Sequence, residues 1–182
     1  MDYVPTNTLQ RCMLLTDISH WDSVLSAWYW LSKKSEITWE FVCATPHFKW
    51  DYSGLSQNEN ITWDIITSGN NLKFKWNVES LSLNPNITWE IVCSNPQINW
   101  DYCHLSANLN ITWDIVRDNP DKPWQYYWLS SNPNITWDIV CANPDKDWNY
   151  SKLSSNPNIT WDIILSNTHL PWLYISLFNP LN

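Results

Sequence analysis

The sequence predicts an all-α solenoid of six helix–turn–helix repeats. The first observation is a tandem repeat, because the triplet Ile-Thr-Trp recurs at spacings of 24, 26, 24, 24 and 24 residues. The second is that the chain has only 2 glycines among 182 residues, whereas a β-solenoid needs a tight turn at every period. A fixed period of this kind is typical of solenoids, since one repeat cannot bury its apolar face until a neighbour stacks on it.

Twelve of the 16 tryptophans form a ladder with two members in each repeat. The first members are Trp39, Trp63, Trp89, Trp113, Trp137 and Trp161, and the second members are Trp50, Trp76, Trp100, Trp124, Trp148 and Trp172. Packing between repeats explains such a ladder most simply, so we expect these rings to lie in the core or at its margin. The alternative is a platform of exposed rings that stacks on sugars or bases.

Residues 1–35 do not match the repeat, and their second half predicts a helix over about residues 18–33. Asp17 supplies a capping residue, and apolar residues follow it at helical steps. We expect this helix to cap the N-terminal end of the array, because a solenoid needs an atypical end unit over its first exposed face. Trp28 and Trp30 lie off the ladder and are candidates for exposed contact residues.

Each repeat in the array, residues 36–178, is predicted to hold two helices. In the most regular copy, helix A covers about residues 135–142 and helix B about residues 146–155. Each half begins at an Asn or Asp such as Asn134 or Asp121, which favours an N-cap, and ends at Asn-Pro, where a helix cannot continue. The alternation in Asn-Ile-Thr-Trp-Asp-Ile-Val also fits a strand, so a β-solenoid is the alternative fold.

Within helix A, periodicity predicts a stripe formed by Ile135, Ile139 and Ala142. Asp138 should lie in the first turn, where a negative charge meets the positive end of the helix dipole. Six Asn-X-Ser/Thr sequons also occur in the chain. Because no secretory signal precedes them, we interpret these asparagines as helix caps. They are Asn60, Asn86, Asn110, Asn134, Asn149 and Asn158.

The second repeat carries the one change of length, two extra residues between Trp63 and Trp76. Gly69 lies in this stretch and fits a left-handed residue that closes the helix. After the array, residues 179–182 form a tail, and no polar closing helix is evident. The C-terminal face is therefore a candidate for end-to-end association into a homo-oligomer.

Charge and hydropathy narrow the partners and the location. The formal net charge is −8, and an acidic surface repels phosphate backbones, so nucleic acid is an unfavourable partner and a basic protein face a better one. No apolar run approaches the roughly 18 residues of a membrane span. The start of the chain lacks a secretory signal, so we expect a cytoplasmic protein that meets no membrane.

The residue types that carry chemistry do not form a site in the sequence. Cys43, Cys93 and Cys141 share one position in alternate repeats, roughly 20 Å apart if helices pack about 10 Å apart, which is too far for a disulfide or a shared zinc. We expect them to be small buried or half-buried residues. No histidine pairs with a second ligand at metal or triad spacing, and no phosphate loop or nucleophile elbow occurs. The sequence therefore predicts no enzyme, no metal and no cofactor.

The strings Asn-Pro-Asn-Ile-Thr-Trp-Asp-Ile-Val and Asn-Pro-Asp-Lys-Pro-Trp resemble the tryptophan-rich tandem repeats of giant DNA viruses of the mimivirus type. The resemblance covers about residues 36–178. It implies a viral repeat protein made in the cytoplasm of an infected host cell, with packaging into the virion as a further option. It implies no activity and no site residue.

The function predicted from these features is a non-catalytic protein-interaction or scaffold module. Specificity should reside in positions that differ between repeats, because packing does not dictate them. These candidates are Tyr126, Tyr127, Trp128, Arg117, His104 and Lys152. One alternative is an aromatic array that binds glycans or nucleic acid, for which Lys73 and Lys75 would be the best basic stripe. The other is a structural subunit that assembles end to end.

Overall fold

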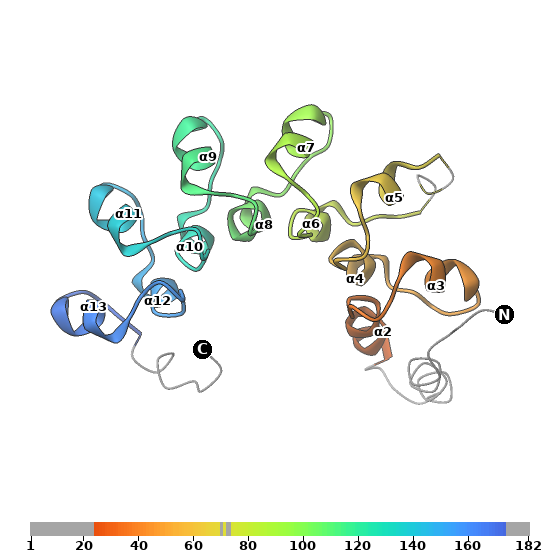
Figure 1. The fold of residues 1–182 in the computed structure, drawn as a ribbon, viewed down its shortest axis with the longest axis horizontal. Coiled ribbons are helices and arrows are strands. Elements are labelled where there is room, and N and C mark those ends of the chain that lie inside the picture. The colour runs from red at the N-terminus through yellow and green to blue at the C-terminus, as the bar shows by residue number, and fades with distance from the viewer. Residues whose placement is uncertain (1–23, 70, 72–73, 174–182) are drawn as a thin grey trace. The chain divides into compact units, whose positions relative to one another are not determined.

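The computed structural model describes residues 24–69, 71 and 74–173, and these residues form short α-helices without any strand (Figure 1). Helices at regular spacing confirm the prediction of an all-α repeat, and the β-solenoid alternative is wrong. The A helices, which begin at the first tryptophan of a repeat, are α3 (Trp39–Ala44), α5 (Trp63–Thr67), α7 (Trp89–Ser94), α9 (Trp113–Asp118), α11 (Trp137–Ala142) and α13 (Trp161–Ser166). The B helices are α2 (Val24–Ser32), α4 (Tyr52–Ser56), α6 (Val78–Leu81), α8 (Tyr102–Ala107), α10 (Tyr126–Leu129) and α12 (Tyr150–Leu153).

The chain divides into two compact units, Met1–Ile87 and Thr88–Asn182. In the first unit α2 packs on α4 and α4 on α6, and in the second unit α8 packs on α10. Within each unit the B helices lie in one row and the A helices in another (Figure 1). Of the N-terminal helix predicted over 18–33, residues 24–32 are helical as α2, and the rest of its start lies outside the described residues.

Each A helix begins at a tryptophan because the threonine before it caps the helix. Thr136 has an extended backbone (φ −97°, ψ 166°), and its hydroxyl accepts a hydrogen bond from the N–H of Ile139 at 3.4 Å. The predicted cap at Asn134 is therefore wrong, and helix A starts two residues later than expected. Asp138 does lie in the first turn, as predicted.

The B helices are shorter than the predicted span of about 146–155. In α12 the cap is Asn149, whose Oδ1 accepts a hydrogen bond from the N–H of Lys152 at 2.9 Å. Just before it, the N–H of Trp148 donates to the carbonyl of Lys146 at 2.7 Å, a tight turn that keeps these residues out of the helix. The cap of α10 is likewise Gln125 and not the predicted Asp121.

Within each unit, a buried asparagine ties a repeat to the one before it. Asn132 is 1% exposed, and its Nδ2 donates to the carbonyls of Ser106 at 3.1 Å, Asn108 at 3.0 Å and Ile111 at 3.3 Å. Its Oδ1 accepts from the N–H of Asn134 at 2.9 Å, so the amide is fully bonded. The same three-carbonyl contact is made by Asn58, Asn84 and Asn156.

The asparagine two positions later also reaches the preceding repeat. The Nδ2 of Asn134 donates to the carbonyls of Leu109 at 2.7 Å and Ile111 at 3.1 Å. Equivalent bonds are made by Asn60, Asn86 and Asn158. These sequon asparagines are therefore ties between repeats and not helix caps, whereas Asn149 does cap α12.

Within each unit, a buried serine at the end of a B helix binds the following repeat. Ser130 has no exposed surface; its Oγ donates to the carbonyl of Tyr126 at 2.7 Å and accepts from the N–H of Asn149 at 2.9 Å. The serine thus fixes the start of the next B helix. The same acceptor role is filled by Ser32, Ser56, Ser106 and Ser154.

The apolar core of a repeat consists of Ile135, Val140 and Leu153, with exposed fractions of 0%, 3% and 0%. The predicted stripe was partly wrong, because Ala142 is exposed and Ile139 only half-buried. The helix starts at residue 137, so Ile135 precedes it and reaches the core from the turn. None of the helices in the described part of the chain has the length and apolar composition that a membrane span requires.

Two further predictions fail for local reasons. Gly69 does not adopt a positive φ; α5 ends at Thr67, and its C-cap is Ser68, which has an extended backbone (φ −62°, ψ 135°). Cys43, Cys93 and Cys141 are exposed rather than buried. Each follows a buried valine on its helix, and the next residue of a helix points about 100° away.

Candidate binding surface

The second tryptophan of each repeat is a packing residue. Trp148 is 8% exposed, and its Nε1 donates to the carbonyl of Asn143 at 2.8 Å. Its ring meets Trp113 of the preceding repeat, with centroids 5.7 Å apart, and the edge of Tyr126 at 5.1 Å. Equally low exposure is found at Trp100, Trp124 and Trp172. These rings hold successive repeats together.

The first tryptophan of each repeat is half-buried, with the exception of Trp161, which is 45% exposed. The expectation that the ladder lies in the core or at its margin is therefore confirmed for the described residues. Rings that meet along the ladder are tilted by 45° to 48° to one another. A flat platform for sugars or bases is consequently absent from the described part of the ladder.

Three of the predicted contact residues come together in the second unit as an aromatic–lysine patch, formed by Tyr127, Trp128 and Lys152. Tyr127 is 46% exposed and Trp128 38% exposed, and their rings meet edge-on with centroids 5.1 Å apart. The Nζ of Lys152 lies 4.7 Å from the ring centre of Tyr127 and 4.9 Å from that of Trp128. A cation over two rings is an attractive contact that fixes the lysine between α10 and α12.

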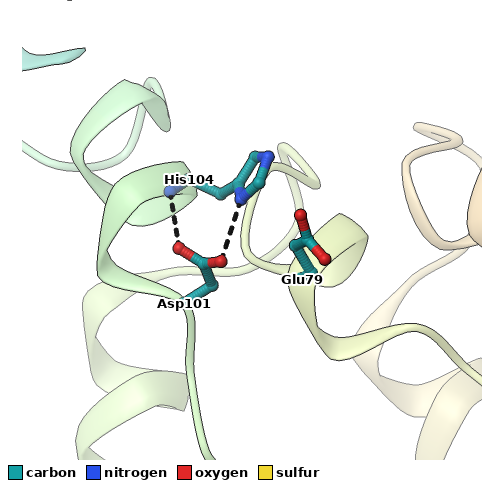
Figure 2. A group of neighbouring side chains, drawn as sticks. All are labelled: Glu79, Asp101 and His104. Carbon is teal, nitrogen blue, oxygen red and sulfur yellow. Dashed lines mark hydrogen bonds and ion pairs between the residues drawn. The ribbon is translucent and has the colours of Figure 1, made fainter.

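His104 occupies the position in α8 that Trp128 occupies in α10 and Lys152 in α12, at intervals of 24 residues. The ring Nδ1 of His104 lies 3.2 Å from Oδ2 of Asp101, and the backbone N–H of His104 donates to Oδ1 of Asp101 at 3.1 Å (Figure 2). Burial alone would raise the pKa of Asp101, but the hydrogen bonds from His104 outweigh burial and lower this pKa. Three variable positions thus follow one another along the B helices of the second unit.

The other two predicted contact residues lie elsewhere. Tyr126 is half-buried against Trp148, and burial raises the pKa of its hydroxyl. It shares its position with Tyr102 and Tyr150, so it belongs to the repeated packing and not to the variable set.

Arg117 is exposed in the last turn of α9, in the row of A helices. Its guanidinium contacts Asp114 at 2.6 Å and Asp118 at 2.9 Å. The structure therefore does not bring Arg117 together with the aromatic–lysine patch.

In the first unit, the two tryptophans of α2 differ from each other. Trp28 is 5% exposed and meets Trp50 edge-on at 5.8 Å, so its prediction as an exposed contact residue is wrong. It occupies the position that Tyr52 holds one repeat later, which is a packing position. Trp30 is 59% exposed beside Tyr29, and the Nζ of Lys33 lies 5.9 Å from its ring centre. Aromatic rings with a nearby lysine therefore occur on the B helices of both units.

Sequence analysis missed a set of grooves, each lying between one A helix and the loop that follows the next A helix, and each named here after these two A helices. The α7–α9 groove has a volume of about 710 Å³, and its walls include Trp89, Cys93, Pro96, Tyr102 and Lys122. The α9–α11 groove has a volume of about 340 Å³, with walls that include Trp113, Arg117, Pro120, Tyr126 and Lys146. The first unit holds an equivalent groove of about 370 Å³ beside Trp39, Cys43 and Tyr52. The recurring tyrosine after the second tryptophan was the available signal for these grooves.

Comparison of the chain with models of protein families, with curated proteins and with solved structures finds no match. The function is therefore argued from the geometry of the described residues.

Proposed function

We propose that the protein is a non-catalytic protein-interaction module, a solenoid of six helix pairs whose B helices select the partner through their variable positions. The observation that carries this proposal is the aromatic–lysine patch, in which two large exposed rings lie beside a half-buried lysine. The predicted scaffold function rests on the same surface.

The ties between repeats support the solenoid. Within each unit, the asparagine contacts join residues that are 21 to 28 positions apart in the chain, and the serine contacts join residues 19 to 21 positions apart. Both kinds of contact therefore connect a repeat to its immediate neighbours. Such nearest-neighbour contacts are the defining feature of a solenoid. Because the same residues make them in each copy, the array can present different side chains without changing its framework.

The patch residues are not needed for packing. In α8 the same two positions are held by Cys103 and His104, and α8 still packs on α10. Residues that the fold does not require, and that expose aromatic surface, are typical of protein interfaces, in which tyrosine and tryptophan are enriched. The patch therefore favours a protein partner.

The other candidate functions have weaker support. Stacking on a glycan favours parallel exposed rings, whereas Tyr127 and Trp128 meet at 88°. For nucleic acid, one residue of the predicted basic stripe, Lys73, lies outside the described residues. End-to-end association would depend on the C-terminal face of the array, and residues 174–178 at its end also lie outside the described residues. We therefore place the interaction on the B helices.

Site-specific photo-crosslinking tests the proposal. A photoreactive phenylalanine replaces Trp128 in one preparation and Leu165, which is 63% exposed on α13, in a matched control. We expect the probe at 128 to capture a defined protein that the probe at 165 does not capture. Capture should fall about tenfold or more when Tyr127→Ser and Lys152→Ser are added, because interface aromatics carry much of the binding energy. Identical captured sets at the two positions, or capture that survives both substitutions, would refute the proposal.

A further inference from the structure

We propose a second binding surface, independent of the aromatic–lysine patch: the α7–α9 and α9–α11 grooves together bind a proline-rich segment of a partner protein in the extended polyproline II conformation. The two grooves adjoin, because Lys122 lines both of them. They form one track through the second unit.

The tryptophans in this track carry unused hydrogen-bond donors. The second tryptophan of each repeat in this track donates its indole N–H to a carbonyl inside the fold. Nε1 of Trp124 donates to the carbonyl of Asn119 at 2.9 Å, and Nε1 of Trp148 donates to the carbonyl of Asn143 at 2.8 Å. In contrast, no described residue accepts a hydrogen bond from Nε1 of Trp89 or Trp113, although both rings are packed in place. Each groove is therefore lined by a tryptophan whose indole N–H has no acceptor among the described residues.

The tyrosine of each groove supplies a second group of this kind. The hydroxyls of Tyr102 and Tyr126 have no hydrogen-bond partner among the described residues, and both rings are held edge-on against a ladder tryptophan at 5.2 Å and 5.1 Å. Burial is the main cause of the raised pKa of each hydroxyl, so both hydroxyls stay protonated at neutral pH and can donate a hydrogen bond. The lining of each groove thus includes an indole and a phenol whose donors have no acceptor among the described residues.

The cations of the track are already neutralised. Lys122 pairs with Asp121 and Lys146 with Asp145, each at 2.9 Å, and Arg117 lies 2.6 Å from Asp114. Since a lysine that holds a carboxylate attracts a second anion weakly, the track does not select an acidic ligand. The complementary ligand is neutral and rich in acceptors.

A polyproline II segment has this chemistry. Proline lacks an N–H, and the polyproline II backbone makes no internal hydrogen bonds, so its carbonyls are left to accept bonds from outside. Aromatic grooves dock such segments by packing rings against the prolines while side-chain donors bind the carbonyls. The ring faces of Trp89 and Trp113, with the N–H and O–H groups beside them, match this requirement along a track with prolines Pro96 and Pro120 in its walls.

The experiment is an indole NMR titration of the ¹⁵N-tryptophan-labelled full chain with a polyproline peptide of about nine residues, or three turns. Signals are assigned with Trp89→Phe, Trp113→Phe and Trp148→Phe. We expect the Trp89 and Trp113 signals to move on titration, and the Trp148 signal, whose N–H is bonded inside the fold, to stay. The titration itself is recorded on the unaltered protein, and the variants serve only to assign its signals.

Trp113→Phe keeps an aromatic ring against Trp148 and removes the donor, so it should weaken binding of the peptide about five- to tenfold. Trp128→Phe, outside the track, should leave the affinity unchanged. Absence of any shift at Trp89 and Trp113 up to millimolar peptide would overturn the proposal. So would movement of these signals by maltohexaose at lower concentration than by the peptide, which would assign the track to a glycan.

Discussion

At the scale of single residues, three side chains per repeat connect neighbours: an amide that bonds three carbonyls, a second amide two positions later, and a serine hydroxyl. Their contacts join positions about one repeat apart in the chain, as in the bond from Nδ2 of Asn132 to the carbonyl of Asn108 at 3.0 Å. Buried polar groups with all their bonds made fix one register, since a shifted register would leave them unsatisfied.

Asn132→Asp tests the row of buried asparagines that tie repeats together, here called the amide ladder. The new carboxylate would face three carbonyl oxygens in a buried site, so we expect the free energy of unfolding at pH 7 to fall by about 3 kcal/mol or more. The site would raise the pKa of this carboxyl above its unfolded value, so the variant should be more stable near pH 4 than at pH 7. Urea unfolding at the two pH values gives both quantities.

Asn99→Asp is the matched control, because Asn99 is exposed and the same change of charge should cost about 0.5 kcal/mol or less there. Equal losses at the two positions would show that net charge, and not the ladder, sets the stability.

Reasoning from sequence was right about the ladder tryptophans and wrong about asparagines such as Asn134 for one physical reason. A large apolar ring that recurs at the repeat period is buried most simply by packing between neighbouring repeats. An asparagine before an apolar run, such as Asn134, is equally compatible with a helix cap and with a contact to the preceding repeat. Thr136, the true cap, has the same local signature two positions later.

At the scale of elements, the A helices are defined by their caps. Thr136→Ala removes the hydroxyl that accepts from the N–H of Ile139, and we expect a loss of about 1 kcal/mol of unfolding free energy. Thr136→Ser retains the hydroxyl and should lose less than half of that. Thermal unfolding followed by circular dichroism ranks the variants, and equal destabilisation by Ala and Ser would indicate that the threonine methyl, rather than the cap, matters.

The packing of α2 on α4 depends on Gly54. A Cβ added there would collide with the backbone carbonyl of Tyr29 and would lie 2.9 Å from Cβ of Ser32. We expect Gly54→Ala to destabilise the protein by about 1–3 kcal/mol, because backbone must move to admit the methyl group.

Gly69→Ala provides the control for that prediction. A Cβ at Gly69 meets nothing within 4 Å, and its φ is not positive, so this change should be neutral or slightly stabilising. Chemical denaturation of the pair measures the difference. A neutral Gly54→Ala would contradict the close approach of the two helices.

Element boundaries were harder to predict than element type. The Asn-Pro breaks limited the helices correctly, but the sequence did not reveal that the segment before Asn149 forms a tight turn through the N–H of Trp148. The grooves were missed for a related reason. Their walls come from two successive repeats, as with Trp113 and Lys146, so the recurring tyrosine marked one wall and not the space between two repeats.

At the scale of the whole molecule, the proposed solenoid predicts that repeats are removable in whole units. Deletion of residues 132–155 joins Ser131 to Asn156, which would then take the place of Asn132 against the carbonyls of the preceding repeat. We expect a folded helical protein with a lower melting temperature, because one set of inter-repeat contacts is lost. Circular dichroism and calorimetry measure both properties.

A deletion of residues 132–143 serves as the control, since it removes half a repeat and places a B-helix segment where an A helix is required. This variant should lose most of its cooperative unfolding. Similar melting of the two deletions would contradict nearest-neighbour stacking.

The amide ladder also gives the stack a polarity. In the described pairs, donors at Asn132 and Asn156 always face acceptors on the copy that precedes them in the chain. A copy added by tandem duplication carries amide donors toward the copy before it and carbonyl acceptors toward the copy after it, so it matches both neighbours. An inverted copy would place amide donors opposite amide donors. Lengthening of such an array is therefore a one-way process at the level of hydrogen bonding, much as a polar filament accepts new subunits in a single orientation.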